Sequence, residues 1–83
     1  MFKAVVTVTF KKSILDPQGS AVLKALKSLG FQGVEDVRVG KHIEVLLQSE
    51  SQEKAKYEIE TMCSKLLANP VIEDYYFEVA EVE

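Results

Sequence analysis

Two hydrophobic periodicities follow one another along this chain of 83 residues, and their order is the feature that most restricts its fold. Segments in which every second residue is apolar predict strands, and segments with apolar residues three or four apart predict helices. The strand pattern covers residues 2–11, 34–39, 42–48 and 71–79, and the helix pattern covers residues 16–30 and 49–69. That order predicts one α+β domain over residues 1–83 with a ferredoxin-like βαββαβ fold, a four-stranded antiparallel sheet with two helices on one face.

The first strand indicates which face of the sheet meets the core. Its even positions are all apolar, whereas its odd positions mix apolar and polar side chains; the even set is Phe2, Ala4, Val6, Val8 and Phe10. We therefore expect the even set to point inward. The opposite face keeps several apolar residues among its polar groups, and a dimer formed through the sheets would cover it.

The first helix has a start signal and a stop signal. Asp16 offers a side-chain oxygen to the free amides of the first turn, and Pro17 suits the first helical position. Gly30 stands where a left-handed cap ends a helix. Gly40 and Lys41 then separate two strand patterns, so residues 34–48 are predicted to form an antiparallel hairpin.

The second helix has two candidate caps. Ser49 with Gln52 three residues later fits a capping box, and Ser51 is the competing cap. Asn69 precedes Pro70, which pushes it out of the helical region and ends the helix. The last strand follows, and residues 80–83 are expected to fray.

Composition places the chain among soluble globular proteins, with 47% apolar and 28% charged residues. No apolar run approaches the roughly 18 residues of a membrane span, and the N-terminus lacks the apolar core of a signal peptide. The single cysteine cannot form an internal disulfide, which agrees with a reducing compartment. We therefore expect a cytoplasmic protein that does not bind membranes.

Charge is divided unevenly along the chain. Residues 1–42 carry seven basic and three acidic groups, a balance of +4, whereas residues 43–83 carry three basic and ten acidic groups, a balance of −7. Such a division favours contacts with another copy or a partner through complementary fields, although solvated faces would look the same. The overall acidic sign argues against nucleic acid as a partner, because binding phosphates requires a basic face.

Signals for catalysis or metal binding are weak, so we predict no catalytic residue and no metal ligand. His42 is the only histidine, and Cys63 falls on the apolar stripe of the second helix, where a thiol is inert. Glu73 and Asp74 are adjacent on a strand, so their carboxylates point to opposite faces. The central strands lack aromatics on the open face for stacking RNA bases. Two readings remain, a non-catalytic interaction module and a dimeric metabolite-binding regulatory module.

Three strings of the sequence resemble the PurS family, the small subunit of phosphoribosylformylglycinamidine synthase. They are Leu15-Asp-Pro-Gln-Gly-Ser-Ala-Val22, Val37-Arg-Val-Gly-Lys41 and Leu66-Leu-Ala-Asn-Pro-Val-Ile-Glu-Asp-Tyr75. Each string alone is modest evidence, but the three in this order and spacing are specific, and the resemblance covers essentially the whole chain.

The resemblance implies a place in purine biosynthesis. The synthase converts formylglycinamide ribonucleotide into the amidine with ATP and glutamine. A PurQ-type glutaminase subunit releases ammonia, and a PurL-type synthase subunit performs the ATP-dependent step. The small subunit bridges the two as a homodimer or higher homo-oligomer, supports ammonia transfer and has no catalytic residues. ATP, glutamine and magnesium are therefore expected at the partner subunits, and no cofactor is expected in this chain.

The resemblance also implies which residues matter. Asp16, Pro17 and Gly40 match the motifs of the family, and we expect them to have a structural role. The partner-interface candidates are Gln18, Gly19, Arg38, Lys41, Asn69, Glu73, Asp74 and Tyr75. Among them, Gly19 lies in the first turn of a helix, where glycine is costly, so a close approach by another chain would explain it. Arg38 is the only arginine, and its planar fork favours carboxylate pairing at an interface.

Overall fold

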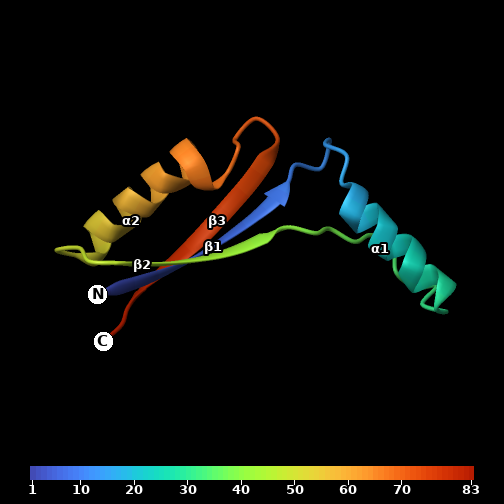
Figure 1. Ribbon diagram of the computed structural model, residues 1–83, viewed down its shortest axis with the longest axis horizontal. Coiled ribbons are helices and arrows are strands. Elements are labelled where there is room, and N and C mark those ends of the chain that lie inside the picture. The colour runs from blue at the N-terminus through green and yellow to red at the C-terminus, as the bar shows by residue number, and fades with distance from the viewer.

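The structure, a computed structural model, describes residues 1–83 (Figure 1). Its elements in chain order are β1 (Phe2–Phe10), α1 (Pro17–Ser28), β2 (Lys41–Leu47), α2 (Gln52–Met62), a π-helical turn η1 (Cys63–Leu67) and β3 (Glu73–Glu81). The three strands form one antiparallel sheet in the order β2-β1-β3, so the N-terminal strand is central. Phe2 lies opposite Leu47 on one side and opposite Glu81 on the other.

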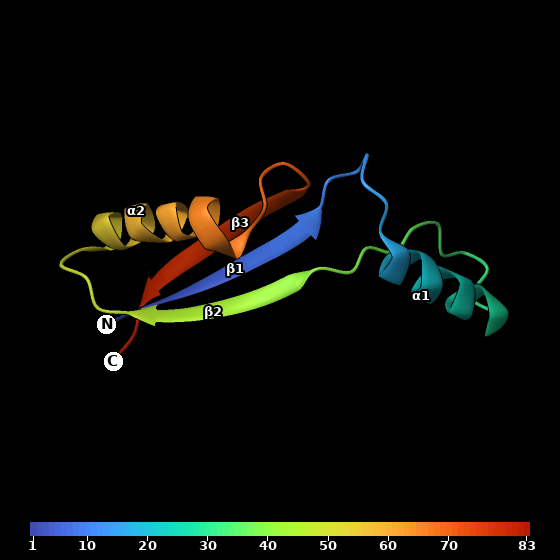
Figure 2. The ribbon, with the colours of Figure 1, turned by 45° about the horizontal axis from the view of Figure 1, so that its top comes forward.

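The predicted four-stranded sheet is wrong, because residues 34–39 do not form a strand. This segment is extended, but its amides are bound by side chains: Val37 donates to the Asp36 carboxylate at 2.9 Å and Val39 donates to Asp16 at 3.0 Å. The predicted hairpin is wrong for the same reason. The chain does not reverse at Gly40 and Lys41; it runs from the extended segment directly into β2 (Figure 2).

The prediction that both helices cover one face is also wrong, because only α2 packs on the sheet. α2 lies against β3 and β1. α1 projects beyond the end of the sheet, which gives the molecule extents of 51 × 29 × 14 Å (Figures 1 and 2). We call residues 11–40 the arm: α1 with the two segments that join it to β1 and β2. Gly19 is the only buried residue of α1.

The core lies between α2 and the sheet, as the alternation of β1 predicts. Nine apolar residues are buried there: Phe2, Ala4, Val6, Val8, Ala55, Ile59, Cys63, Ala68 and Val79. Four of them are even positions of β1, which confirms the inward face of that strand. Phe10, the fifth even position, is only half-buried at the end of the strand.

The caps differ in part from the sequence signals. Gly30 has a φ of +102°, which confirms the left-handed cap. The cap of α2 is Ser51, whose hydroxyl accepts from the Lys54 amide at 3.1 Å, so of the two candidate caps Ser51 is confirmed and the Ser49 capping box is wrong. The Ser49 hydroxyl instead donates to Glu58 at 3.1 Å. Residues 80 and 81 belong to β3, and the Val82 amide donates to the Met1 carbonyl at 2.9 Å.

Candidate functional site

The base of the arm is held by a single carboxylate. Asp16 accepts from the Gly19 amide with Oδ1 at 2.9 Å and from the Val39 amide with Oδ2 at 3.0 Å. The first bond caps α1, as its sequence predicts. The second joins the start of α1 to the segment that returns to β2, 23 residues away along the chain. We call Asp16, Gly19, Val37 and Val39 the clasp.

Gly19 completes the clasp by allowing a close approach. A Cβ atom at this position would lie 2.4 Å from the Val37 carbonyl oxygen and 2.5 Å from Asp16 Oδ2. The returning segment of the same chain therefore already requires glycine at this position, and an approach by another chain stays a prediction. Glycine here lets two segments of the arm touch backbone to backbone.

Gly40 has the same role where the arm joins the sheet. A Cβ atom here would lie 2.2 Å from the Val8 carbonyl oxygen and 2.9 Å from Thr9 Cγ2. Gly40 lies directly before β2, so its close contact with β1 fixes the position at which β2 begins to pair with β1. The structural role expected for Gly40 therefore has a specific cause, which is contact with β1 and not a turn.

The clasp predicts a pH dependence of stability. Hydrogen bonds from the Gly19 and Val39 amides lower the pKa of Asp16 below its ordinary value of 3.8, and Arg38 adds a smaller lowering. The folded state therefore favours the ionised carboxylate. Its contribution is complete above the ordinary pKa and is lost as the pH falls through the lowered one. Urea midpoints of the wild type should fall more steeply than those of Asp16→Asn between about pH 6 and pH 3.

The asparagine variant is a matched control because it keeps one oxygen acceptor but does not titrate. Glu44, whose pKa is lowered by hydrogen bonds from His42 and Lys3, titrates in both proteins and cancels in the comparison. Parallel pH curves for the two proteins would contradict an energetic role of the clasp.

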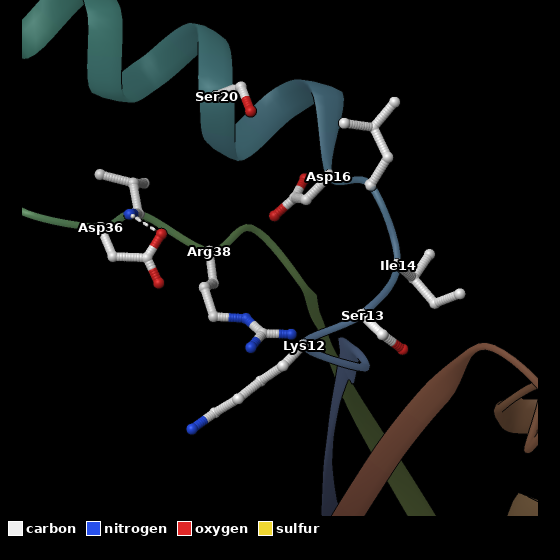
Figure 3. A pocket seen from close by; sticks show the side chains of 9 residues that line it. Lys12, Ser13, Ile14, Asp16, Ser20, Asp36 and Arg38 are labelled. Carbon is white, nitrogen blue, oxygen red and sulfur yellow. Dashed lines mark hydrogen bonds between the residues drawn. The ribbon is translucent and has the colours of Figure 1, made fainter.

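A hollow of about 420 Å³ opens beside the clasp (Figure 3). Lys12 and Arg38 line it together with the hydroxyls of Ser13 and Ser20. Neither Lys12 nor Arg38 forms an ion pair within the chain. Arg38 is exposed, so its guanidinium is available at the surface, and the carboxylate pairing predicted for it at an interface stays a prediction. The sequence did not predict four of the residues found at the clasp and this hollow: Lys12, Ser13, Val37 and Val39. Val37 and Val39 were missed because their alternation with polar residues resembles that of a strand.

Four predicted site residues meet where the arm joins the sheet. Gln18, Gly40, Lys41 and Glu73 line one small hollow of about 110 Å³. Lys41 Nζ lies 3.7 Å from Glu73 Oε2, and the Asn69 amide donates to Glu73 Oε1 at 2.7 Å. Through these two contacts the Glu73 carboxylate links β3 to β2 and to the turn before β3. Its side chain is only 10% exposed.

The remaining predicted residues are separated from that group. Asp74 points to the open face of the sheet opposite Thr9, while Tyr75 is half-buried on the core face. Burial and the neighbouring Glu60 carboxylate raise the pKa of the Tyr75 phenol. Pro17 occupies the first position of α1, as its motif predicts.

The polar groups at the arm base mostly bind other groups of the same chain. The carboxylates at the arm base are engaged with backbone amides or Lys41, and the only histidine forms an exposed pair with Glu44 at 2.9 Å. The structure gathers no group of three or more His, Cys, Asp or Glu side chains that could hold a metal ion. Cys63 is buried, and burial raises the pKa of its thiol.

No helix combines the length and the apolar character needed to span a bilayer.

Comparison with known sequences gives a consistent result. The family model described as "PurS: Phosphoribosylformylglycinamidine (FGAM) synthase" matches residues 3–81. The chain is 46% identical over 83 residues to "Phosphoribosylformylglycinamidine synthase subunit PurS" of Methanocaldococcus jannaschii, which covers 100% of both chains. It is 50% identical over 82 residues to the protein of the same name from Bacillus subtilis, covering 99% of this chain and 96% of that one.

Solved structures extend the similarity to three dimensions. The crystal structure of Methanocaldococcus jannaschii PurS is similar with a TM-score of 0.88 at 46% identity, over 100% of both chains, so the projecting arm is included. A chain of the structure described as "Structure of PurLQS from Thermotoga maritima" is similar with a TM-score of 0.86 at 30% identity, over 95% of this chain and 96% of that one.

Proposed function

The chain belongs to the PurS family of phosphoribosylformylglycinamidine synthase subunits, and from this membership we propose that it bridges the two larger subunits of that enzyme. In this proposal a PurQ-type glutaminase releases ammonia, a PurL-type subunit uses it with ATP to form the amidine, and this chain keeps them together for the transfer. The observation that carries the proposal is the similarity over nearly its whole length to a chain of the Thermotoga maritima PurLQS structure.

The geometry of the site supports a role in positioning. The predicted residues at the arm base link α1 to β2 and β3 through the clasp and the Lys41–Glu73 pair. They fix the direction of a projecting arm, which is what a bridging subunit needs. We propose that ATP, glutamine and magnesium bind to the partner subunits. We also propose that the complex is cytoplasmic, because a lone buried thiol agrees with a reducing compartment.

We also propose a homodimer or higher homo-oligomer. The support is the apolar surface that the arm leaves in solvent: Leu15 is 76% exposed, Leu29 74% and Phe31 57%. Large apolar side chains exposed at both ends of a projecting helix favour contact with another chain.

Reconstitution tests the proposal. The PurL and PurQ subunits from the same source are mixed with formylglycinamide ribonucleotide, ATP, magnesium and glutamine, with and without this chain. The glutamine-dependent rate should need the chain, because ammonia must pass between the larger subunits. With ammonium chloride in place of glutamine, the need for the chain should be much smaller. An unchanged glutamine-dependent rate without the chain would overturn the proposal.

A further inference from the structure

Two cationic side chains at the base of the arm lack a partner. Lys12 lies in the segment that leaves β1, Arg38 lies in the segment that returns to β2, and both line the hollow beside the clasp (Figure 3). Both residues are exposed, and neither forms an ion pair within the chain. Two like charges that line one hollow repel each other, and an anion bound between them would relieve that repulsion.

The two carboxylates that line the hollow do not supply this anion. Asp16 uses both of its oxygens for the clasp. Asp36 accepts a hydrogen bond from the amide of the next residue at 2.9 Å. Neither carboxylate forms an ion pair with Lys12 or Arg38, so both cations remain available to a ligand.

The hydrogen-bond donors of the hollow are side chains and not the free amides of a helix start. Pro17 at the first position of α1 has no amide hydrogen, and the Gly19 amide is already bound by Asp16. The hydroxyls of Ser13 and Ser20 also line the hollow and can donate. A ligand here would therefore meet two cationic side chains and two hydroxyls.

We propose that this hollow binds the phosphate group of a phosphate monoester through Lys12 and Arg38. Such a group has a charge of about −1.5 to −2 at neutral pH and three strong acceptor oxygens, which is enough for both cations and a hydroxyl. A carboxylate has a single negative charge, which the planar fork of Arg38 alone would bind, leaving Lys12 unpaired. The charge of the hollow therefore favours a phosphate over an acidic side chain.

The rest of the hollow has room for the organic part of the ester. Its volume of about 420 Å³ exceeds what a phosphate group alone would fill. The apolar part of its lining is Ile14, Leu15 and Val37, of which Leu15 is 76% exposed. Covering these side chains removes apolar surface from water, so an ester should bind more tightly than inorganic phosphate. This site is additional to the bridging function and does not rest on it.

Titration of the full chain with phenyl phosphate tests the site. Amide chemical shifts of the isotope-labelled protein are followed by NMR at low ionic strength, because salt screens exposed cations. We expect saturable shifts at residues that line the hollow, Ser13 and Arg38 among them. Inorganic phosphate and benzoate are titrated in parallel, and both should bind more weakly. The first lacks the organic part of the ester, and the second replaces its phosphate by a carboxylate.

Neutral variants of the two cations test their role. Lys12→Gln and Arg38→Gln should each raise the Kd for phenyl phosphate about tenfold, because each removes a charged hydrogen bond to the ligand. Lys24→Gln is the matched control, since it removes the same charge from an exposed position of α1 that does not line the hollow. Its Kd should stay close to that of the wild type. All three side chains are exposed, so the variants should fold normally, and their amide spectra verify this.

The outcomes decide between a phosphate site and the alternatives. Saturable shifts at the hollow that Lys12→Gln and Arg38→Gln weaken, and Lys24→Gln does not, support the proposal. Absence of saturable shifts, or equal weakening by Lys24→Gln, overturns it. Benzoate binding as tightly as phenyl phosphate would also overturn it and would assign the hollow to an acidic side chain of another protein. Inorganic phosphate binding as tightly as phenyl phosphate would overturn the choice of an ester. The bridging function is tested separately by reconstitution and stands or falls independently of these results.

Discussion

Replacing Ile59 by alanine is expected to lower the free energy of unfolding by about 2–5 kcal/mol. Ile59 is fully buried at the centre of the core and is its largest fully buried side chain. The substitution removes three carbons from a layer made of one sheet face and one helix, and little else is available to fill the space. Urea denaturation at several protein concentrations measures the loss and separates it from any effect of self-association.

The matched control is Ile59→Val, which keeps the branched shape and should cost only about 0.5–1.5 kcal/mol. A domain of this size has few kilocalories in reserve, so the alanine variant should be largely unfolded at physiological temperature. Equal and small losses for the two variants would show that the core relaxes freely around this position, contrary to close packing.

Replacing Gly40 by alanine is expected to cost at least about 1–3 kcal/mol, although the change adds only one methyl group. The new Cβ would lie 2.2 Å from the Val8 carbonyl oxygen. Because that neighbour is backbone of the central strand, relief requires β2 or the arm to move. The variant should therefore lose synthase reconstitution as well as stability, and the measurements are urea denaturation and the glutamine-dependent rate.

Gly33→Ala is the control for that substitution. Gly33 lies in the same arm, has an ordinary negative-φ backbone and has no atom near the position of an added Cβ. Alanine there should be neutral or should stabilise by about 0.4–1 kcal/mol, because it restricts the unfolded chain. Similar losses for both variants would indicate that the arm needs flexible backbone in general and not the specific contact with Val8.

Local signals predicted the parts of the fold that depend on neighbouring residues. The Asp16 cap binds an amide three residues away, and Gly30 ends α1 by its own conformation. The inward face of β1 follows from alternation within nine residues. In each case the sequence window contains both partners of the interaction, so the pattern alone identifies it.

The errors arose where the partner of an element lies far along the chain or where nothing in its pattern names that partner. Val37 and Val39 alternate as a strand would, but the Val39 amide bonds to Asp16, which is distant in sequence. The apolar row of α1 predicts burial without naming the surface that buries it. Placing α1 on its own sheet was therefore the simplest assumption and was wrong. The same long-range packing brings the Val37 backbone of the same chain close to Gly19, whose predicted place at an interface stays a prediction.

The central position of β1 has a consequence for how the protein is made. Phe2 pairs with Glu81, so the middle strand of the sheet meets one of its two neighbours only when the opposite end of these 83 residues has been synthesised. Until then β1 can pair only with β2, and a two-stranded ribbon is marginal in water. The β1–β3 pairing joins residues nearly 80 positions apart, and we expect such non-local pairing to slow folding. The core face of β1 therefore stays uncovered until α2 and β3 have been made.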